Sequence, residues 1–193
     1  MKQKLILIGG GGHATSCIDV IEAEGKFIIE GIVDLKEKIG HKTLGYPVIA
    51  SDEDLPDLCR KNYSFLITIG HMGERLKRDN LIAILKKNNA KIATIISPFA
   101  YISKHAKIAQ GTIIMHHALV NANAVIGENC IINSKALIEH DCKIGNNCHI
   151  STGAIVNGAV SIVDGVFFGS GAVAKQSISI AENSFIKANS LVR

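Results

Sequence analysis

The sequence has few of the residues that usually fill a large core or break a chain into loops. Among 193 residues there is no tryptophan, there are three prolines, and aromatic residues make up 5%. Because 47% of the residues are nonetheless hydrophobic, the apolar mass must come mainly from Ile, Val, Ala and Leu. This bias favours β-structure built from small, repetitive layers. With charged residues at 20%, a chain of this composition is not expected to be disordered.

No strong charge of one sign is present either. The net charge of +4 arises from 21 basic and 17 acidic residues, and it divides evenly between the parts of the chain before and after Tyr101. No dense Lys/Arg stripe with interleaved aromatics occurs, which argues against a nucleic-acid partner. The uncharged stretches 108–127 and 144–163 contain Asn, His, Gln or Gly, so we do not expect membrane insertion. We expect a cytoplasmic protein without disulfides, since the five cysteines include no CxxC pair.

Before Pro98, apolar runs alternate with amphipathic stretches. Short apolar runs that end at Gly or Asp predict strands, and amphipathic stretches predict helices. We expect strands over 4–8, 27–33, 65–69 and 92–96, and helices over 14–24, 52–60 and 74–87. Strands that alternate with helices predict a parallel sheet covered by helices.

After Pro98 a six-residue repeat begins. β-Branched residues recur without a break at eleven successive steps: Ile102, Ile108, Ile114, Val120, Ile126, Ile132, Ile138, Ile144, Ile150, Val156 and Ile162. Such a repeat predicts a parallel β-helix in which three steps close one triangular coil and the aliphatic residue points inward. Cys130, Cys142 and Cys148 occupy the small position two residues before these steps, so we interpret them as interior fillers rather than metal ligands.

The sequence therefore predicts two domains. The first is a small α/β Rossmann-like domain over 1–98, and the second is a left-handed parallel β-helix over 99–193. The phase of the repeat places His140 two residues after the inward Ile138, so its side chain is expected to project outward at or near a corner. A neutral imidazole is a suitable general base for acyl transfer. The carboxylate of Asp141 could orient it, and Glu139 is a rival for that role.

A glycine loop follows the first predicted strand. Gly9, Gly11 and Ala14 fit a GxGxxA pattern, and Asp34 ends the next predicted strand. Bare amides, a helix N-terminus and a carboxylate can hold a phosphate and a ribose. Read alone, the pattern indicates NAD. Since only about half of a dinucleotide-binding fold precedes the repeat, a nucleotide-diphosphate sugar fits the available space better.

Together these features resemble one protein family. It comprises the bacterial sialic-acid O-acetyltransferase type and the related N-acetyltransferases of nucleotide-linked 4-amino sugars, of the kind used for bacillosamine. The resemblance rests on three segments: Ile8-Gly9-Gly10-Gly11-Gly12-His13-Ala14, Gly45-Tyr46-Pro47-Val48-Ile49 and Ile132-Asn133-Ser134-Lys135-Ala136-Leu137-Ile138-Glu139-His140-Asp141. The chain departs from the family at its end, where the usual Gly-Val-Pro-Ala-Lys-like tail is replaced by 186–193.

The resemblance implies an acetyl-CoA-dependent N-acetyltransferase that acts on the 4-amino group of a UDP- or dTDP-linked amino-deoxy sugar. It implies a homotrimer with active sites between subunits, and a catalytic pair of His140 as the base and Asp141. It also implies acetyl-CoA contacts at Asn133, His149 and Gly158. Contacts with the nucleotide sugar are implied for Gly10, Gly11, Gly12, His13, Asp34 and Gly70.

Other interpretations remain open at this point. The same base could serve O-acetylation of a sialic-acid-like sugar, and the glycine loop alone is compatible with a nicotinamide-dependent dehydrogenase. A protein of another class, a non-catalytic β-helix that binds a nucleotide sugar, is also compatible. His116 and His117 suggest a metal site, but no further His or acidic ligand recurs at the coil spacing, so we expect surface or intersubunit contacts and no metal.

Overall fold

The computed structural model describes residues 2–73 and 75–193, and the chain folds as two compact units. The first unit contains the chain through Gly70 and the segment that ends at Ala93, and the second contains His71–Gly73 and Thr94–Arg193. From the sequence we expected the division at residue 98. None of the helices among the described residues is long and apolar enough to cross a membrane.

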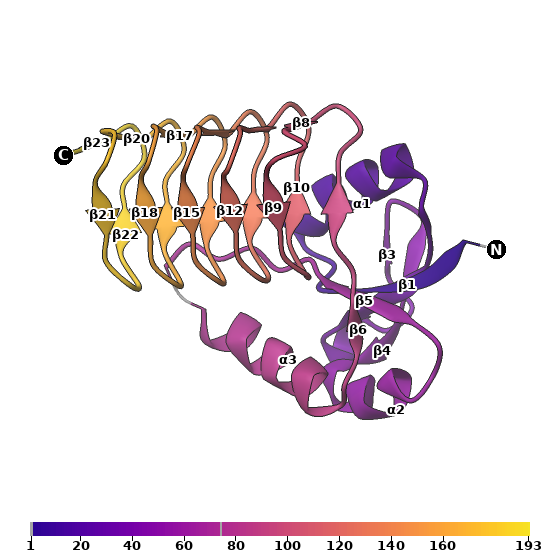
Figure 1. Cartoon of the computed structure of the whole chain (residues 1–193). Coiled ribbons are helices and arrows are strands. Elements are labelled where there is room, and N and C mark those ends of the chain that lie inside the picture. Colours follow the sequence, from indigo (N-terminus) through magenta and orange to yellow (C-terminus); the bar gives the residue numbers. More distant parts are fainter. Residues whose placement is uncertain (1, 74) are drawn as a thin grey trace. The chain divides into compact units, whose positions relative to one another are not determined.

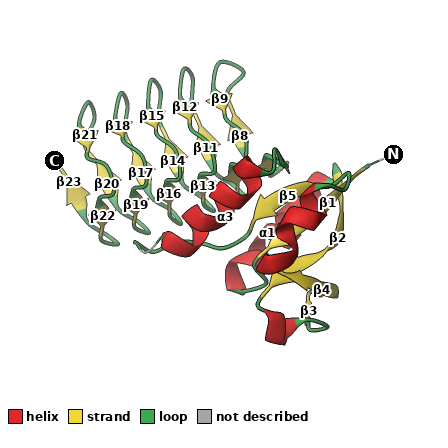
Figure 2. Cartoon of the chain, turned by 90° about the horizontal axis from the view of Figure 1, so that it is seen from below, coloured by secondary structure: helices red, strands yellow, loops and turns green. Residues whose placement is uncertain are grey.

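The first unit is a six-stranded sheet flanked by helices. Its elements are β1 (Gln3–Ile8), α1 (Gly12–Glu24), β2 (Phe27–Asp34), η1 (Lys36–Lys38), β3 (Lys42–Thr43), β4 (Tyr46–Ser51), η2 (Asp52–Asp54), α2 (Leu55–Cys59), β5 (Ser64–Ile67), α3 (Leu76–Lys87) and β6 (Lys91–Ile92). The strand order is β3-β4-β2-β1-β5-β6, and Figure 2 shows β5, β1, β2 and β4 side by side. All pairs are parallel except β3 with β4.

Both faces of this sheet are covered by apolar side chains. Ile6 and Ile8 of β1 pack in one cluster with Leu81 and Leu85 of α3. Leu5 and Leu7 are also fully buried, and because strand side chains alternate they point to the opposite face. The helix α1 ends at Gly25, which adopts a left-handed φ of 68° and whose N–H bonds the carbonyl of Ile21. This left-handed glycine ends the helix at residue 24, as expected from the sequence.

The second unit is a left-handed parallel β-helix. It contains seventeen two-residue strands: β7 (Ile95–Ile96), β8 (Tyr101–Ile102), β9 (Lys107–Ile108), β10 (Ile113–Ile114), β11 (Leu119–Val120), β12 (Val125–Ile126), β13 (Ile131–Ile132), β14 (Leu137–Ile138), β15 (Lys143–Ile144), β16 (His149–Ile150), β17 (Ile155–Val156), β18 (Ser161–Ile162), β19 (Phe167–Phe168), β20 (Val173–Ala174), β21 (Ser179–Ile180), β22 (Phe185–Ile186) and β23 (Leu191–Val192). Figure 1 shows these strands stacked side by side along the β-helix, from β8 and β9 to β21 and β23.

The strands form three parallel sheets in which each residue pairs with the one 18 positions along, for example Ile132 with Ile150. The predicted inward series lines the core together with Cys130, Cys142 and Cys148, which are completely buried. Corner residues such as Asn123 and Asp141 adopt left-handed φ values near 60°, a conformation that Asn and Asp tolerate better than most residues. The predicted coil and its interior are thus confirmed.

Two expectations about the first domain are corrected. The strand expected over 92–96 is two strands, because the N–H of Ala93 still bonds Phe65 of the first unit whereas that of Ile95 bonds Thr112 of the β-helix. Tyr46 and Pro47 begin the strand β4, in which Pro47 pairs with the edge strand β3. The helix expected from Glu74 begins at Leu76, and Glu74 itself lies outside the described residues.

Candidate functional site

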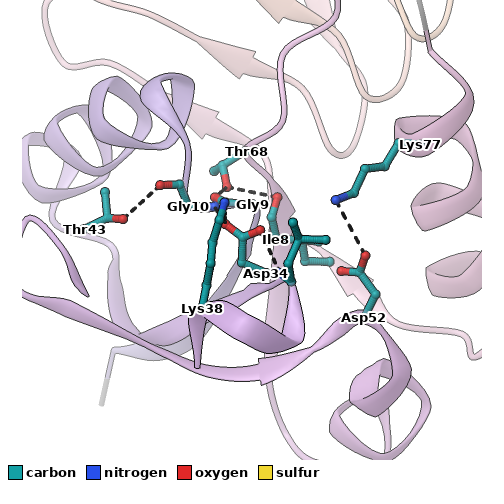
Figure 3. Close-up of polar contacts among 10 residues, drawn as sticks. Ile8, Gly9, Gly10, Asp34, Lys38, Thr43, Asp52, Thr68 and Lys77 are labelled. Carbon is teal, nitrogen blue, oxygen red and sulfur yellow. Dashed lines mark hydrogen bonds and ion pairs between the residues drawn. The ribbon is translucent and has the colours of Figure 1, made fainter. Parts of the chain in front are cut away.

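In the first unit, the glycine loop after β1 is held to the end of β2 by Asp34 (Figure 3). One carboxylate oxygen of Asp34 accepts the N–H of Gly10 at 2.9 Å and the ammonium of Lys38 at 3.1 Å, and the other accepts the N–H of Leu35 at 2.8 Å. Burial alone would raise the pKa of Asp34, but the hydrogen bonds from Leu35, Gly10 and Lys38 outweigh it and hold that pKa below its usual value. The carboxylate predicted to bind a ribose therefore already fixes the loop.

Two threonines hold the same loop from other directions (Figure 3). The hydroxyl of Thr43 donates to the carbonyl of Gly10 at 2.9 Å, and the hydroxyl of Thr68, beyond β5, lies 2.6 Å from the carbonyl of Gly9. Since β1 and β5 are neighbours in the sheet, the loops at their carboxyl ends meet where ligands bind in such folds. Neither threonine was identified from the sequence, because their contacts join segments far apart in the chain.

The start of α1 is open to a ligand. Its N-cap residue, Gly11, makes no side-chain capping bond, and a side chain added at Gly11 or Gly12 would meet no atom within 4 Å. His13 follows in the first turn, and the position of a Cβ on Gly70 lies 3.8 Å from the His13 side chain. An uncapped helix start with glycines favours an anion such as a phosphate. The structure thus gathers the predicted residues Gly11, Gly12, His13 and Gly70 at one end of the sheet.

In the β-helix, His140 lies on the corner between β14 and β15, with 60% of its side chain exposed. Its Nδ1 lies 2.8 Å from Oδ2 of Asp141. Because an ionised carboxylate only accepts, Nδ1 carries a proton, and in the neutral ring Nε2 carries the lone pair. The hydrogen bond with His140, followed by one from Asn123, holds the pKa of Asp141 below its usual value.

Glu139, the rival carboxylate, is directed elsewhere. Its Oε2 accepts the side-chain amide of Asn121 at 2.8 Å and the backbone N–H of His140 at 3.2 Å. The ring of His140 instead lies against Gly158 of the next coil, where an added Cβ would stand 2.8 Å from Cε1 and Nε2. The predicted residues His140, Asp141 and Gly158 therefore form one cluster.

His149 and Asn133 form a second cluster on another sheet of the prism. His149 is only 7% exposed, and its Nδ1 lies 2.8 Å from the carbonyl oxygen of His71, so that Nδ1 must donate. Its Nε2 then accepts the side-chain amide of Asn133, whose oxygen in turn accepts the N–H of Ser134. Within one chain these groups lie apart from His140, and a contact of His149 with an acetyl group stays a prediction.

A groove of about 590 Å³ lies beyond Gly158 toward the end of the prism. Its lining comprises Asn157, Val173, Lys175, Gln176, Leu191 and Arg193. Two cations thus flank an apolar floor in successive coils, and the groove begins one residue from Gly158. Sequence analysis missed Lys175 and Arg193, although both occupy the position directly after an inward residue, the same position as Glu139.

Metal ligation finds no support in the arrangement of side chains. Across residues 2–73 and 75–193, no group of three or more His, Cys, Asp or Glu side chains is placed to hold an ion. His116 contacts Ser97 through Nδ1 at 2.6 Å, and the ring of Phe99 lies near both His116 and His117.

In the comparison with known proteins, a segment of each unit matches a family model. Residues 4–82 match the family model of the PglD N-terminal domain, and residues 123–158 match the model of the bacterial transferase hexapeptide with six repeats. The first segment is thus similar to the PglD N-terminal domain and the second to the hexapeptide transferases, and the resemblance stated from the sequence is confirmed. No match was found among curated proteins.

Several solved structures are similar to this chain. The chain is 26% identical to the acetyltransferase domain of PglB from Neisseria gonorrhoeae, with a TM-score of 0.87. The match covers 100% of this chain and 92% of the PglB domain. A structure of that domain in complex with acetyl coenzyme A is also similar to this chain. PerB from Caulobacter crescentus, in complex with CoA and GDP-perosamine, is 24% identical with a TM-score of 0.65 and coverages of 97% and 92%. WeeI from Acinetobacter baumannii is 18% identical with a TM-score of 0.62 and coverages of 93% and 95%.

Proposed function

We propose that the protein is an acetyltransferase that moves the acetyl group of acetyl-CoA to the amino group of a nucleotide-linked amino-deoxy sugar. The observation that carries this proposal is the exposed His140–Asp141 pair, with its proton fixed on Nδ1, on a hexapeptide-repeat prism. The likeness to a PglB acetyltransferase domain that binds acetyl coenzyme A supports the donor. The N-terminal domain supports a nucleotide-linked acceptor.

In the proposed reaction, Nε2 of His140 removes a proton from the attacking amine while Asp141 stabilises the imidazolium that forms. The amine attacks the thioester carbonyl, the tetrahedral intermediate collapses, and the thiolate of coenzyme A leaves with the proton that His140 returns. Transfer is direct, so the chain itself forms no covalent intermediate. We place the carbonyl contact at the second amide N–H of Asn133 and the backbone of Gly158. His149, whose Nε2 accepts the other amide N–H of Asn133, would hold that amide in place, and both residues would come from a neighbouring subunit of a homotrimer.

The groove beyond Gly158 fits the donor in charge and in length. Arg193 lies three coils beyond His140, which is about 14 Å at the usual strand spacing. The pantetheine arm of coenzyme A has about the length of four extended residues, also about 14 Å. With the thioester at His140, the diphosphate therefore falls near Lys175 and Arg193, and the arm lies over the apolar Val173 and Leu191.

The acceptor nucleotide is assigned to the glycine loop of the first unit. The uncapped N-terminus of α1 at Gly11 and Gly12 would take the phosphates, and His13 and Gly70 would line the same crevice. Asp34 would act mainly by holding the loop, since its oxygens already accept three hydrogen bonds. We retain uridine or thymidine diphosphate as the proposed carrier.

The test is acetyl transfer from acetyl-CoA to a panel of nucleotide-linked sugars that differ in having an amine or a hydroxyl at the acceptor carbon. The wild type should acetylate amines, and His140→Ala should lower kcat by about 10²- to 10⁴-fold. The matched control is His105→Ala, another exposed histidine of the β-helix, which should keep full activity. Acetylation of hydroxyl sugars alone would identify an O-acetyltransferase. Transfer to neither class would refute the proposal, as would an unaffected His140→Ala.

A further inference from the structure

The two carboxylates that flank His140 are held by two asparagines of the preceding coil. Asn121 stands 18 residues before Glu139, and Asn123 stands 18 residues before Asp141. Each amide donates to the carboxylate above it, Asn121 to Glu139 at 2.8 Å and Asn123 to Asp141 at 3.2 Å. The two carboxylates contact different parts of His140: Glu139 accepts its backbone N–H, and Asp141 accepts the N–H of its ring.

The backbone explains why Asn123 meets Asp141. Both residues occupy the same corner of consecutive coils and adopt the same left-handed conformation, with φ of 59° and 60°. Their side chains therefore leave the backbone in parallel, one strand spacing apart. Asn123 bonds Oδ1, whereas His140 bonds Oδ2, so both oxygens are engaged and rotation of the carboxylate is restricted.

We propose that Asn123 is a positioning residue, which fixes Asp141 so that its Oδ2 faces Nδ1 of His140. This inference rests on the proposed role of His140 as the base. The charged groups that face His140 are Asp141 and Glu139; the residues above and below its ring, Gly158 and Ala122, are uncharged. Asp141 and Glu139 are the only carboxylates adjacent to the base in sequence, and Asn123 determines which of them its ring contacts.

The direct test uses three variants of Asn123. Asn123→Ala removes the amide, Asn123→Gly removes it while keeping a residue that tolerates a positive φ, and Asn123→Asp places a second carboxylate beside Asp141. The Ala and Gly variants should lower kcat by about 3- to 10-fold, the effect of losing one hydrogen bond, with KM for both substrates unchanged. In an Asp141→Asn background, Asn123→Ala should cause no further loss, because Asn123 acts through Asp141.

The matched control is Asn183→Ala. Asn183 is an exposed corner asparagine with the same φ of 59°, but it lies outside the column of His140. Asn183→Ala should remove the same tolerance for a positive φ and leave kcat unchanged. Equal kinetics for Asn123→Ala and Asn183→Ala would overturn the proposal.

A titration of His140 by NMR separates this inference from the proposed function. Asn123→Asp should raise the pKa of His140, because a second negative charge favours the imidazolium, and Asn123→Ala should lower it, because Asp141 is held less firmly. Asn123→Ala is the diagnostic variant, because the added charge in Asn123→Asp raises this pKa whatever the native role of Asn123, whereas a purely structural role would leave the pKa unchanged in Asn123→Ala. Such shifts without any acetyl transfer by the wild type would refute only the proposed function. Active wild type with no shift in Asn123→Ala would refute only the positioning role.

Discussion

Gly158→Ala is the sharpest perturbation that the structure offers. The added Cβ would stand 2.8 Å from Cε1 and Nε2 of His140, whereas carbon contacts are comfortable only beyond about 3.5 Å. The ring must therefore move by about 0.7 Å. Because the ring is the end of an exposed side chain, it can move without disturbing the coil. The Gly158 backbone is not in the left-handed region, so alanine fits its conformation.

The expected result is an active-site defect in a stable protein. A misplacement of 1 Å can cost about 10²-fold in rate, so a shift of 0.7 Å should lower kcat by about 10- to 100-fold, or about 1.4 to 2.7 kcal/mol in the activation free energy. The melting temperature should stay the same or rise slightly, since replacing glycine lowers the entropy of the unfolded chain.

The assay follows loss of the thioester absorbance of acetyl-CoA with a saturating amino-sugar acceptor. KM for acetyl-CoA should stay constant if Gly158 acts through His140, and it should rise if the methyl group blocks the coenzyme instead. In a His140→Ala background, Gly158→Ala should have no further effect on kcat. Wild-type kcat in Gly158→Ala, or an equal loss with and without His140, would refute the reasoning from ring displacement.

Three further predictions address the groove, the glycine loop and the core of the first unit. The double variant Lys175→Gln, Arg193→Gln should raise KM for acetyl-CoA about tenfold, which is the expected effect of losing one or two exposed contacts with phosphate. KM for acetyl-pantetheine should not change. Equal effects on both donors would contradict a diphosphate site. Asp34→Asn should lower the free energy of unfolding at pH 7, measured in urea. Because the pKa of Asp34 is lowered in the folded state, its contribution to the free energy of unfolding is present above its unfolded pKa and is lost as pH falls through its folded pKa. The difference in stability between the wild type and Asp34→Asn should therefore shrink below about pH 4. A difference that stays constant with pH would count against the three hydrogen bonds. Burial raises the pKa of Cys17 to about 12. In a Cys59→Ser background, which removes the partly exposed thiol, the protein should therefore react with Ellman's reagent at pH 8 only after unfolding, and rapid reaction in the native state would contradict the burial of Cys17.

The β-helix was predictable because its period is set by local geometry. Each coil uses 18 residues, so an unbroken aliphatic series specifies which residues point inward, and it correctly placed His140 outside. The exact end of the first sheet was not predictable. Residues 92–96 form one apolar run, and only the hydrogen-bond partners of Ala93 and Ile95 show that two different sheets share it.

The site was predictable in its residue types but less so in their contacts. The sequence left Asp141 and Glu139 as rivals, because adjacent carboxylates look alike when only their own coil is considered. Their amide partners in the preceding coil, Asn121 and Asn123, separate them. Similarly, the phosphate-binding pattern suggested Asp34 as a ligand contact, whereas the structure directs its carboxylate to the loop and to Lys38.

The surroundings of His140 and of the glycine loop both depend on which residues, far apart in the sequence, each fold brings into contact. In the β-helix, residues 18 apart lie one strand spacing from each other, so the environment of His140 is set by Ala122 below it and Gly158 above it as much as by its neighbours in sequence. A glycine above the base leaves room for its ring, and an asparagine below Asp141 holds the carboxylate. Reading the repeat in columns of 18 would have identified both from the sequence. No such column exists in the α/β domain, where the partners of the glycine loop come from β2, β3 and the end of β5 at irregular separations, and there the contacts had to come from the structure.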